Sequence, residues 1–229
     1  MLAWDADLQL QGSGHYGSSD GLDAPRGLVL AELGGERLLL APGRSGAGIE
    51  GWAYEAGALD EDALSTRRVL SYDDGTARAL VALAEVEAQD LLVTAARGVD
   101  GVEVWRHEGD ALIAQAQDVR AATPGQVSAL AGVGQGAAAR VLVLSAEKNI
   151  LYSYAIPPES RLSDVRQLGP QDGLFLETPS LLRCVQLAGQ SYALIGAGSG
   201  AIAVVTRRMI RSTAVRATTA CRAALATMC

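Results

Sequence analysis

The sequence has few of the residues that usually form catalytic or metal sites. Of its 229 residues only 4% are aromatic, two are histidine and three are cysteine. The cysteines, Cys184, Cys221 and Cys229, are odd in number and contain no CxxC pair, so their spacing predicts neither a disulfide framework nor a zinc site. Cys184 lies in the apolar run RCVQL and is expected to be a small buried side chain.

Long hydrophobic runs and an excess of positive charge are also lacking. No stretch approaches the roughly 18 apolar residues of a membrane span, and the start MLAWDADLQLQ lacks the basic and apolar parts of a secretory signal. The formal net charge is −7, whereas a general nucleic-acid or membrane binder is expected to be basic. We therefore expect neither partner. A cytoplasmic location is the default expectation, with export through a C-terminal signal as the alternative.

The chain is rich instead in short apolar runs that repeat. The first run of each unit reads RGLVLAEL (26–33), RALVALAEV (78–86), SALAGVGQ (128–135) and SLLRCVQL (180–187). The third reads IEGWAY (49–54), VEVWRH (102–107), LYSYAI (151–156) and the weaker AVVTRR (203–208). An apolar second run lies between them in every unit, and a more polar fourth run follows three times. The unit is about 50 residues long, which is the length of a propeller blade.

Glycine and proline clusters separate these runs, as expected for antiparallel strands joined by turns. Four short strands in a radially repeated unit are typical of a β-propeller. We therefore predict an all-β fold: a propeller of about four four-stranded blades, part of a larger one. The predicted domain spans 1–206, with blades at about 26–74, 78–122, 128–172 and 180–206.

One bulky position recurs in the third strand of every predicted blade. It holds Trp52, Trp105, Tyr154 and the smaller Val205. Both faces of a blade sheet contact neighbouring blades, because a blade cannot bury both faces alone. These aromatic residues are therefore expected to pack between blades rather than to bind a nucleotide.

The pattern [VI]-x-[VG]-[WY]-x-x after an apolar run ending in Ala or Gly resembles the lactonase-like and WD-repeat-like β-propellers of bacteria. It is also similar to the propeller segments at the N-termini of secreted bacterial calcium-binding proteins. The resemblance covers about residues 20–206. It implies a propeller fold, but it points to no single activity, because propellers have many functions.

The two ends of the chain depart from the repeat. Residues 8–11 (LQLQ) look like an isolated fourth strand, which in a closed propeller would complete the last blade. Residues 207–229 break the pattern; six of the 19 basic residues and none of the 26 acidic residues lie in 178–229. Three interpretations of this tail are open. It is a basic arm that binds an anionic partner, an amphipathic helix, or non-native sequence that follows a frameshift. We favour the last, which would make the chain the first part of a longer protein.

The first strand of each blade is expected to line a central channel, and its polar residues are the candidate site. The candidates at the start of these strands are Arg26, Arg78, Ser128 and Ser180, and those near the end are Glu32, Glu85, Gln135 and Gln186. Arg26 and Arg78 would meet a ligand carboxylate at one mouth. The alternative is that these side chains are polar only because channel walls are wet.

Other chemistry has little support in the sequence. The aspartates near the ends of the units stand in ordinary turn sequences, and neither an EF-hand loop nor the calcium-binding nonapeptide occurs, so calcium is a weak expectation and no cofactor is predicted. Neither His15 nor His107 belongs to a recognisable catalytic triad, and no GxSxG motif occurs.

Two functions remain from the sequence. The first is a non-catalytic propeller scaffold that binds a small molecule or a protein, part of a larger bacterial and perhaps exported protein. The second, implied by the resemblance, is a propeller lactonase-like hydrolase acting on a sugar lactone or a related ester. Arg26, Arg78, Glu32 and Glu85 would then carry the reaction.

Overall fold

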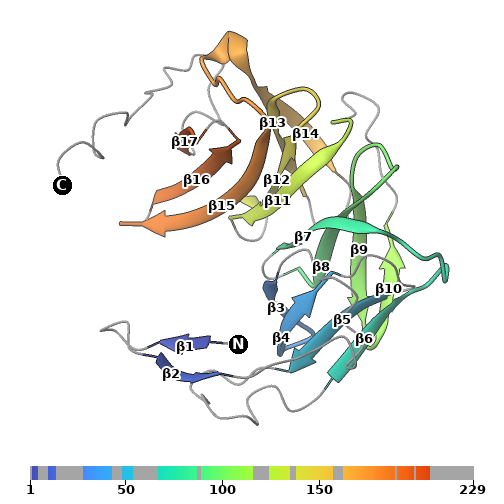
Figure 1. Ribbon diagram of the computed structural model, residues 1–229. Helices are drawn as coiled ribbons and strands as arrows, with labels where there is room; N and C mark the ends of the chain where they lie inside the picture. The colour runs from blue at the N-terminus through green and yellow to red at the C-terminus, as the bar shows by residue number, and fades with distance from the viewer. Residues whose placement is uncertain are drawn as a thin grey trace.

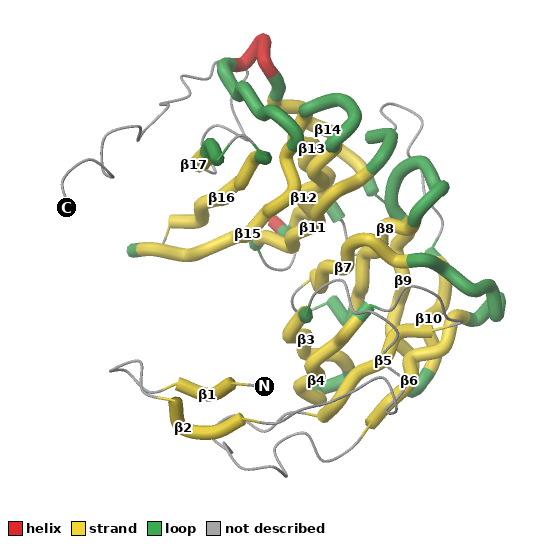
Figure 2. Tube along the Cα trace, in the orientation of Figure 1, coloured by secondary structure: helices red, strands yellow, loops and turns green. Residues whose placement is uncertain are grey.

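The computed structural model confirms the all-β prediction. It describes residues 2–4, 10–13, 28–42, 48–53, 67–86, 89–115, 124–134, 138–156, 162–188, 190–198 and 200–206. Strand makes up most of this part of the chain, and one short 3₁₀ turn, η4 (Pro170–Asp172), precedes β15 (Figure 2). No helix among the described residues is long and apolar enough to cross a membrane.

The strands form four successive antiparallel meanders. The first meander contains β3 (Val29–Leu33), β4 (Glu36–Ala41), β5 (Gly48–Ala53) and β6 (Arg67–Tyr72). The second contains β7 (Leu80–Val86), β8 (Leu91–Ala96), β9 (Glu103–Glu108) and β10 (Ala111–Ala114). The third contains β11 (Val127–Val133), β12 (Arg140–Ser145), β13 (Ile150–Ala155) and β14 (Ser163–Leu168). The fourth contains β15 (Pro179–Leu187), β16 (Gln190–Ala197) and β17 (Ile202–Thr206).

Tight turns between the strands come from residues that accept a left-handed backbone. Gly34 and Gly35, which join β3 to β4, have φ values of 59° and 80°. Two consecutive positive φ values define the hairpin turn whose twist matches that of paired strands, and glycine adopts them without steric cost. The register from Leu33↔Glu36 to Val29↔Leu40 follows directly from this turn.

The first two meanders share one mixed sheet of eight strands. Their outer strands β6 and β10 pair in parallel, with Ser71 N–H donating to Asp110 O at 2.9 Å and Asp73 N–H to Leu112 O at 3.0 Å. The sheet curls until it is nearly closed. Its end strands approach each other where Glu32 N–H donates to Glu85 Oε1 at 2.8 Å.

Apolar residues fill the space between each meander and the next, and they form three clusters. The first joins the first and second meanders through residues such as Leu40, Leu92 and Trp105. The second joins the second and third meanders, and the third joins the third and fourth. Figure 1 shows the meanders following one another along an arc, with β3, β7, β11 and β15 on its inner side. Because the core lies between the sheets, each internal face is covered by the neighbouring meander.

The N-terminal strand does not occupy the place that the sequence suggested. Of residues 8–11, the possible closing strand, the structure describes 10 and 11, which belong to β2 (Leu10–Ser13); this strand pairs with β1 (Leu2–Trp4) in a separate two-stranded sheet. The fourth meander has three strands within the described residues. A nearer partner in sequence explains the difference, since a local hairpin costs less chain entropy to close than a pairing with β17. The tail 207–229 lies outside the described residues.

Candidate functional site

The inner strands of all four meanders line one cavity of about 590 Å³. Small-molecule sites usually have volumes of about 300–1,000 Å³. Each meander contributes a short stretch: Leu28 to Leu30, Leu83 to Glu85, Leu130 to Gly134, and Leu182 to Gln186. Ser191 on β16 completes the lining. Four chain segments about 50 residues apart therefore converge on one space.

The strand register shows that this convergence repeats residue by residue. In each meander the bulky residue of the third strand pairs with a second-strand residue, and that residue pairs with one on the inner strand. These pairs connect each bulky residue to one residue of the inner strand. In order along the chain, Trp52, Trp105, Tyr154 and Val205 are connected to Leu30, Glu85, Gly132 and Cys184. All four of these residues line the cavity. The four inner strands therefore present equivalent positions to the same space.

Close packing of the inner strands sets the shape of the cavity wall. A Cβ atom on Gly132 would collide with the backbone carbonyl oxygen of Glu85 on the neighbouring strand β7. Glycine is therefore required here for β11 to approach β7. On the other side of β7, the Glu85 carboxylate accepts the hydrogen bond from Glu32 N–H. Glu85 is thereby held between the first two meanders.

The cavity combines aliphatic walls with a few polar groups. Glu85 lies on β7, while the exposed Arg183 and Gln186 lie on β15. Cys184 stands between them in the sequence, and burial raises the pKa of its thiol to about 11. This thiol is therefore almost entirely neutral near pH 7. The lining suits a molecule with an apolar body and a polar end, rather than a nucleophilic reaction at Cys184.

The predicted site residues do not all reach this cavity. Glu85 and Gln186 line it. Glu32 is exposed on β3, Ser180 is exposed on β15, and the Ser128 hydroxyl donates to Leu144 O at 3.2 Å. Arg26 and Gln135 lie outside the described residues. The repeat alignment predicts that Glu32 and Glu85 are equivalent. The strand register instead makes Leu30 the equivalent of Glu85. Glu32 lies two residues further along β3, where it pairs with Arg37.

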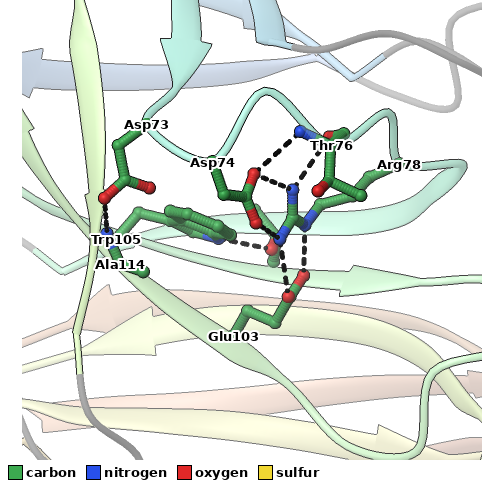
Figure 3. A network of polar contacts seen from close by, with 8 residues as sticks. Asp73, Asp74, Thr76, Arg78, Glu103, Trp105 and Ala114 are labelled. Atoms are coloured by element: carbon green, nitrogen blue, oxygen red, sulfur yellow. Dashed lines mark hydrogen bonds and ion pairs between the residues drawn. The ribbon is translucent and has the colours of Figure 1, made fainter.

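Arg78 is held in a separate polar network between the first and second meanders (Figure 3). Its guanidinium bonds Asp74 at 2.8 Å and 3.0 Å, and Glu103 at 2.9 Å and 3.1 Å. It also lies 4.5 Å from the ring centroids of both Tyr72 and Trp105. A guanidinium placed against aromatic faces is stabilised by cation–π attraction.

This network joins groups from two meanders and leaves Arg78 little capacity for a ligand. The Arg78 hydrogen bonds hold the pKa of Asp74 well below its usual range, so the aspartate is ionised at neutral pH. The Arg78 side chain is nearly buried. The prediction that Arg78 lies at a channel mouth is replaced by a structural role, since its donors are engaged by Asp74, Glu103 and the carbonyl of Thr76.

Sequence reasoning missed several cavity residues. Leu30, Gly132 and Cys184 lie within the apolar first runs, which predict only strands, and Arg183 is one of the six basic residues of 178–229. Each of the first three lies two strand pairings from the bulky third-strand residue, a relation that becomes visible only once the strand register is known. Within the described part of the chain, no group of three or more His, Cys, Asp and Glu side chains could hold a metal ion.

Comparison with known proteins gives no relationship from which a function could be carried over. No model of a known protein family matches this chain, and no curated protein matches it.

Proposed function

We propose that this chain is a non-catalytic scaffold of the β-propeller type, which binds a small amphipathic molecule in the cavity between its inner strands. The observation that supports it best is the matched register of Leu30, Glu85, Gly132 and Cys184 around one cavity. Radially repeated meanders bring their first strands together in this way. By the resemblance described above, the scaffold would be part of a larger bacterial protein, either cytoplasmic, which is the default, or exported.

The polar groups of the cavity suggest which end of a ligand they contact. Arg183 is exposed at the cavity and carries a permanent positive charge. A ligand with an aliphatic chain could place that chain against Leu83, Leu130 and Val185 and its carboxylate near Arg183. The apolar part supplies most of the affinity, and the ion pair orients the ligand.

The hydrolase alternative has less support. It requires Arg26, Arg78, Glu32 and Glu85 to act at the channel, and Arg78 is bound instead by Asp74 and Glu103. Glu85 remains at the cavity, where it accepts a backbone hydrogen bond. A panel of sugar lactones tests this directly. Turnover by the wild-type chain that disappears in Glu85→Gln would replace the scaffold proposal with the hydrolase.

Decanoate is a suitable probe for the ligand proposal, with decanol as its neutral analogue. Cys221→Ser and Cys229→Ser leave Cys184 as the reporting thiol. Its reaction with a maleimide, followed at pH 9 where more of the raised-pKa thiol is ionised, should be slowed by bound decanoate. The melting temperature should rise with decanoate concentration below the micelle range. Arg183→Gln should weaken decanoate binding and leave decanol binding unchanged, whereas Arg97→Gln, an exposed arginine on a distant turn, should change neither. Absence of protection with both probes would refute the proposal.

A further inference from the structure

A leucine recurs on the inner strands, two residues before each of the matched cavity positions. The four are Leu28, Leu83, Leu130 and Leu182, and all of them line the cavity. Leu83, Leu130 and Leu182 are 5%, 5% and 1% exposed, because each packs in the apolar cluster that joins its meander to the preceding one. Leu28 is 53% exposed, and no other meander precedes it among the described residues. Leu28 therefore has the position of a buried leucine but remains in contact with water.

The residue that follows this leucine changes its chemistry at the fourth meander. In the order of the chain it is Val29, Ala84, Ala131 and Arg183, and it lines the cavity each time. The first three are aliphatic, and each packs in or against the cluster that contains the leucine of the next meander. Arg183 is exposed instead. A positive charge therefore stands at the position where the other three meanders pack on their neighbour.

The first and fourth meanders both reach the cavity, but they are not connected in the way that successive meanders are. β3 and β15 line the cavity, yet the described residues of these two meanders share neither a strand pairing nor an apolar cluster. Figure 1 shows β3 and β15 on the inner side of the arc, in its first and last meanders. Leu30 on β3 is 61% exposed, and Leu28 is exposed as well. The cavity therefore has a solvated apolar wall at β3 and a cation at β15.

We propose that the cavity ligand is an elongated carboxylate that bridges this open joint, with its aliphatic chain on Leu28 and Leu30 of β3 and its carboxylate on Arg183 of β15. Such bridging rests on the ligand binding proposed above and specifies the shape of the ligand and its position. The ligand takes the place of the apolar cluster that connects each pair of successive meanders.

The exposed leucines supply the apolar area that such a ligand removes from water. Leu83 and Leu130 are already buried, so a chain that contacts only these two gains little. A chain on Leu28 and Leu30 covers side chains that water now reaches. Each methylene group removed from water increases the affinity up to about fourfold. We therefore expect the affinity to rise with chain length until the chain covers Leu30.

The charges of the cavity determine the direction of the ligand. Arg183 attracts a carboxylate at β15. Glu85 lies on β7, the strand next to β3, and its Oε1 is 2.8 Å from the backbone nitrogen of Glu32, which donates to it. An acidic side chain at this end of the cavity disfavours a second carboxylate there. The apolar end of the ligand therefore points toward β3.

A photoreactive analogue of decanoate locates the end of the chain. It carries a diazirine at the end farthest from the carboxylate, and it is irradiated with the full 229-residue chain. Trypsin cleavage after Arg26 and Arg37 releases residues 27–37, which contain β3, whereas β7 lies in 79–97 and β11 in 121–140. Mass spectrometry should find the label mainly in 27–37, and an excess of decanoate should prevent the labelling. A label confined to 79–97 and 121–140 would overturn the bridging and leave ligand binding in the cavity intact.

Substitution of an exposed leucine tests the same contact by affinity. Leu30→Gln should weaken decanoate binding about tenfold and octanoate binding less, since glutamine removes apolar contact at the far end of the chain. Leu187→Gln is the matched control, because Leu187 is 62% exposed on β15 and lies outside the cavity lining. Binding is followed by the rise in melting temperature and by the protection of Cys184.

The outcomes separate the bridging from the ligand binding on which it rests. No loss of decanoate affinity in Leu30→Gln, or an equal loss in Leu187→Gln, would overturn the bridging even if the wild-type chain binds decanoate. Absence of decanoate binding by the wild-type chain would refute the ligand proposal itself, and the bridging with it.

Discussion

The second and fourth meanders have the same strand register but differ in how many of their faces are covered. In the second meander Trp105 packs on the first meander and Val104 on the third, and both are buried. In the fourth, Val205 packs on the third meander while Val204, its sequence neighbour, is half exposed. Alternation along a strand fixes which face a residue occupies. Whether that face is covered depends on the position of the meander in the series.

Trp105→Ala should cause the largest loss of stability. Removing a buried tryptophan costs about 3–5 kcal/mol, because apolar area is lost and a cavity remains. Here the change also removes the Nε1 hydrogen bond to Thr94 Oγ1 at 2.9 Å and one of the two rings that flank Arg78. Urea unfolding followed by circular dichroism measures the loss. Val205→Ala, at the equivalent position of the fourth meander, should cost clearly less because fewer atoms are removed, and an equal cost would contradict this view.

Arg78→Ala should cause the next largest loss of stability, about 2 kcal/mol. The substitution leaves Glu103 and Asp74 without their cation at a joint between two meanders, and removing one partner of a largely buried ion pair is destabilising. This cost in stability is smaller than that of a fully buried pair, because Asp74 is partly exposed to water. Arg78→Lys should recover part of the loss, since lysine keeps the charge but cannot donate to both carboxylates in one plane. Recovery of full stability by lysine would contradict the role given to the guanidinium.

The sequence predicted the strands of this fold better than it predicted the site. Short apolar runs located the first three strands of each meander, because a strand that packs on both faces is largely apolar along its length, and the more polar runs located the fourth strands β6, β10 and β14. The recurrence of Trp52, Trp105, Tyr154 and Val205 also located equivalent positions correctly. The pattern of neighbouring residues was therefore sufficient to predict both the strands and the recurring bulky position.

The predicted site depended on long-range register, which the sequence does not show. The connection between β3 and β4 is shorter than that between β7 and β8, since Leu33 pairs with Glu36 whereas Val86 pairs with Leu91, and Glu85 therefore matches Leu30 rather than Glu32. Arg78 is predicted to lie at the channel because it begins a first strand, and first strands line the channel of a propeller. Its aromatic and acidic partners, Tyr72, Trp105 and Glu103, come from other strands and could not be placed beside it without the fold.

A matched pair of valine substitutions isolates the effect of coverage. Val104→Ala should cost about 1–3 kcal/mol, because Val104 is buried between the second and third meanders. Val204→Ala should cost less than about 0.5 kcal/mol in the monomer, because its side chain is partly in water already. Denaturant unfolding at low protein concentration gives both values. If the two losses were equal, the face of the fourth meander that carries Val204 would be covered in solution.

The smallest effect should be a change in acid sensitivity at the joint that Arg78 connects. Arg78 lowers the pKa of Asp74 in the folded protein, so the ionised aspartate favours folding above its unfolded-state pKa of about 4. This contribution is lost as the pH falls through the lower pKa of the folded state. The hydrogen bond from Arg140 likewise lowers the pKa of Asp164 in the folded protein. Asp164 therefore also contributes to the loss of folding stability in acid.

Asp74→Asn should therefore lower the melting temperature slightly and equally from pH 7 to about pH 4, and progressively less below that, because the unfolded wild-type protein then takes up a proton at Asp74 that the folded protein does not. Asp110→Asn is a suitable control, since Asp110 is an exposed acid whose oxygen lies at the longer distance of 3.5 Å from Arg68. Melting temperatures measured at half-unit intervals of pH give the comparison. A difference between wild type and Asp74→Asn that stays constant from pH 7 to 3 would mean that asparagine affects this turn by geometry, for example through the Thr76 N–H bond of 2.9 Å, rather than by charge.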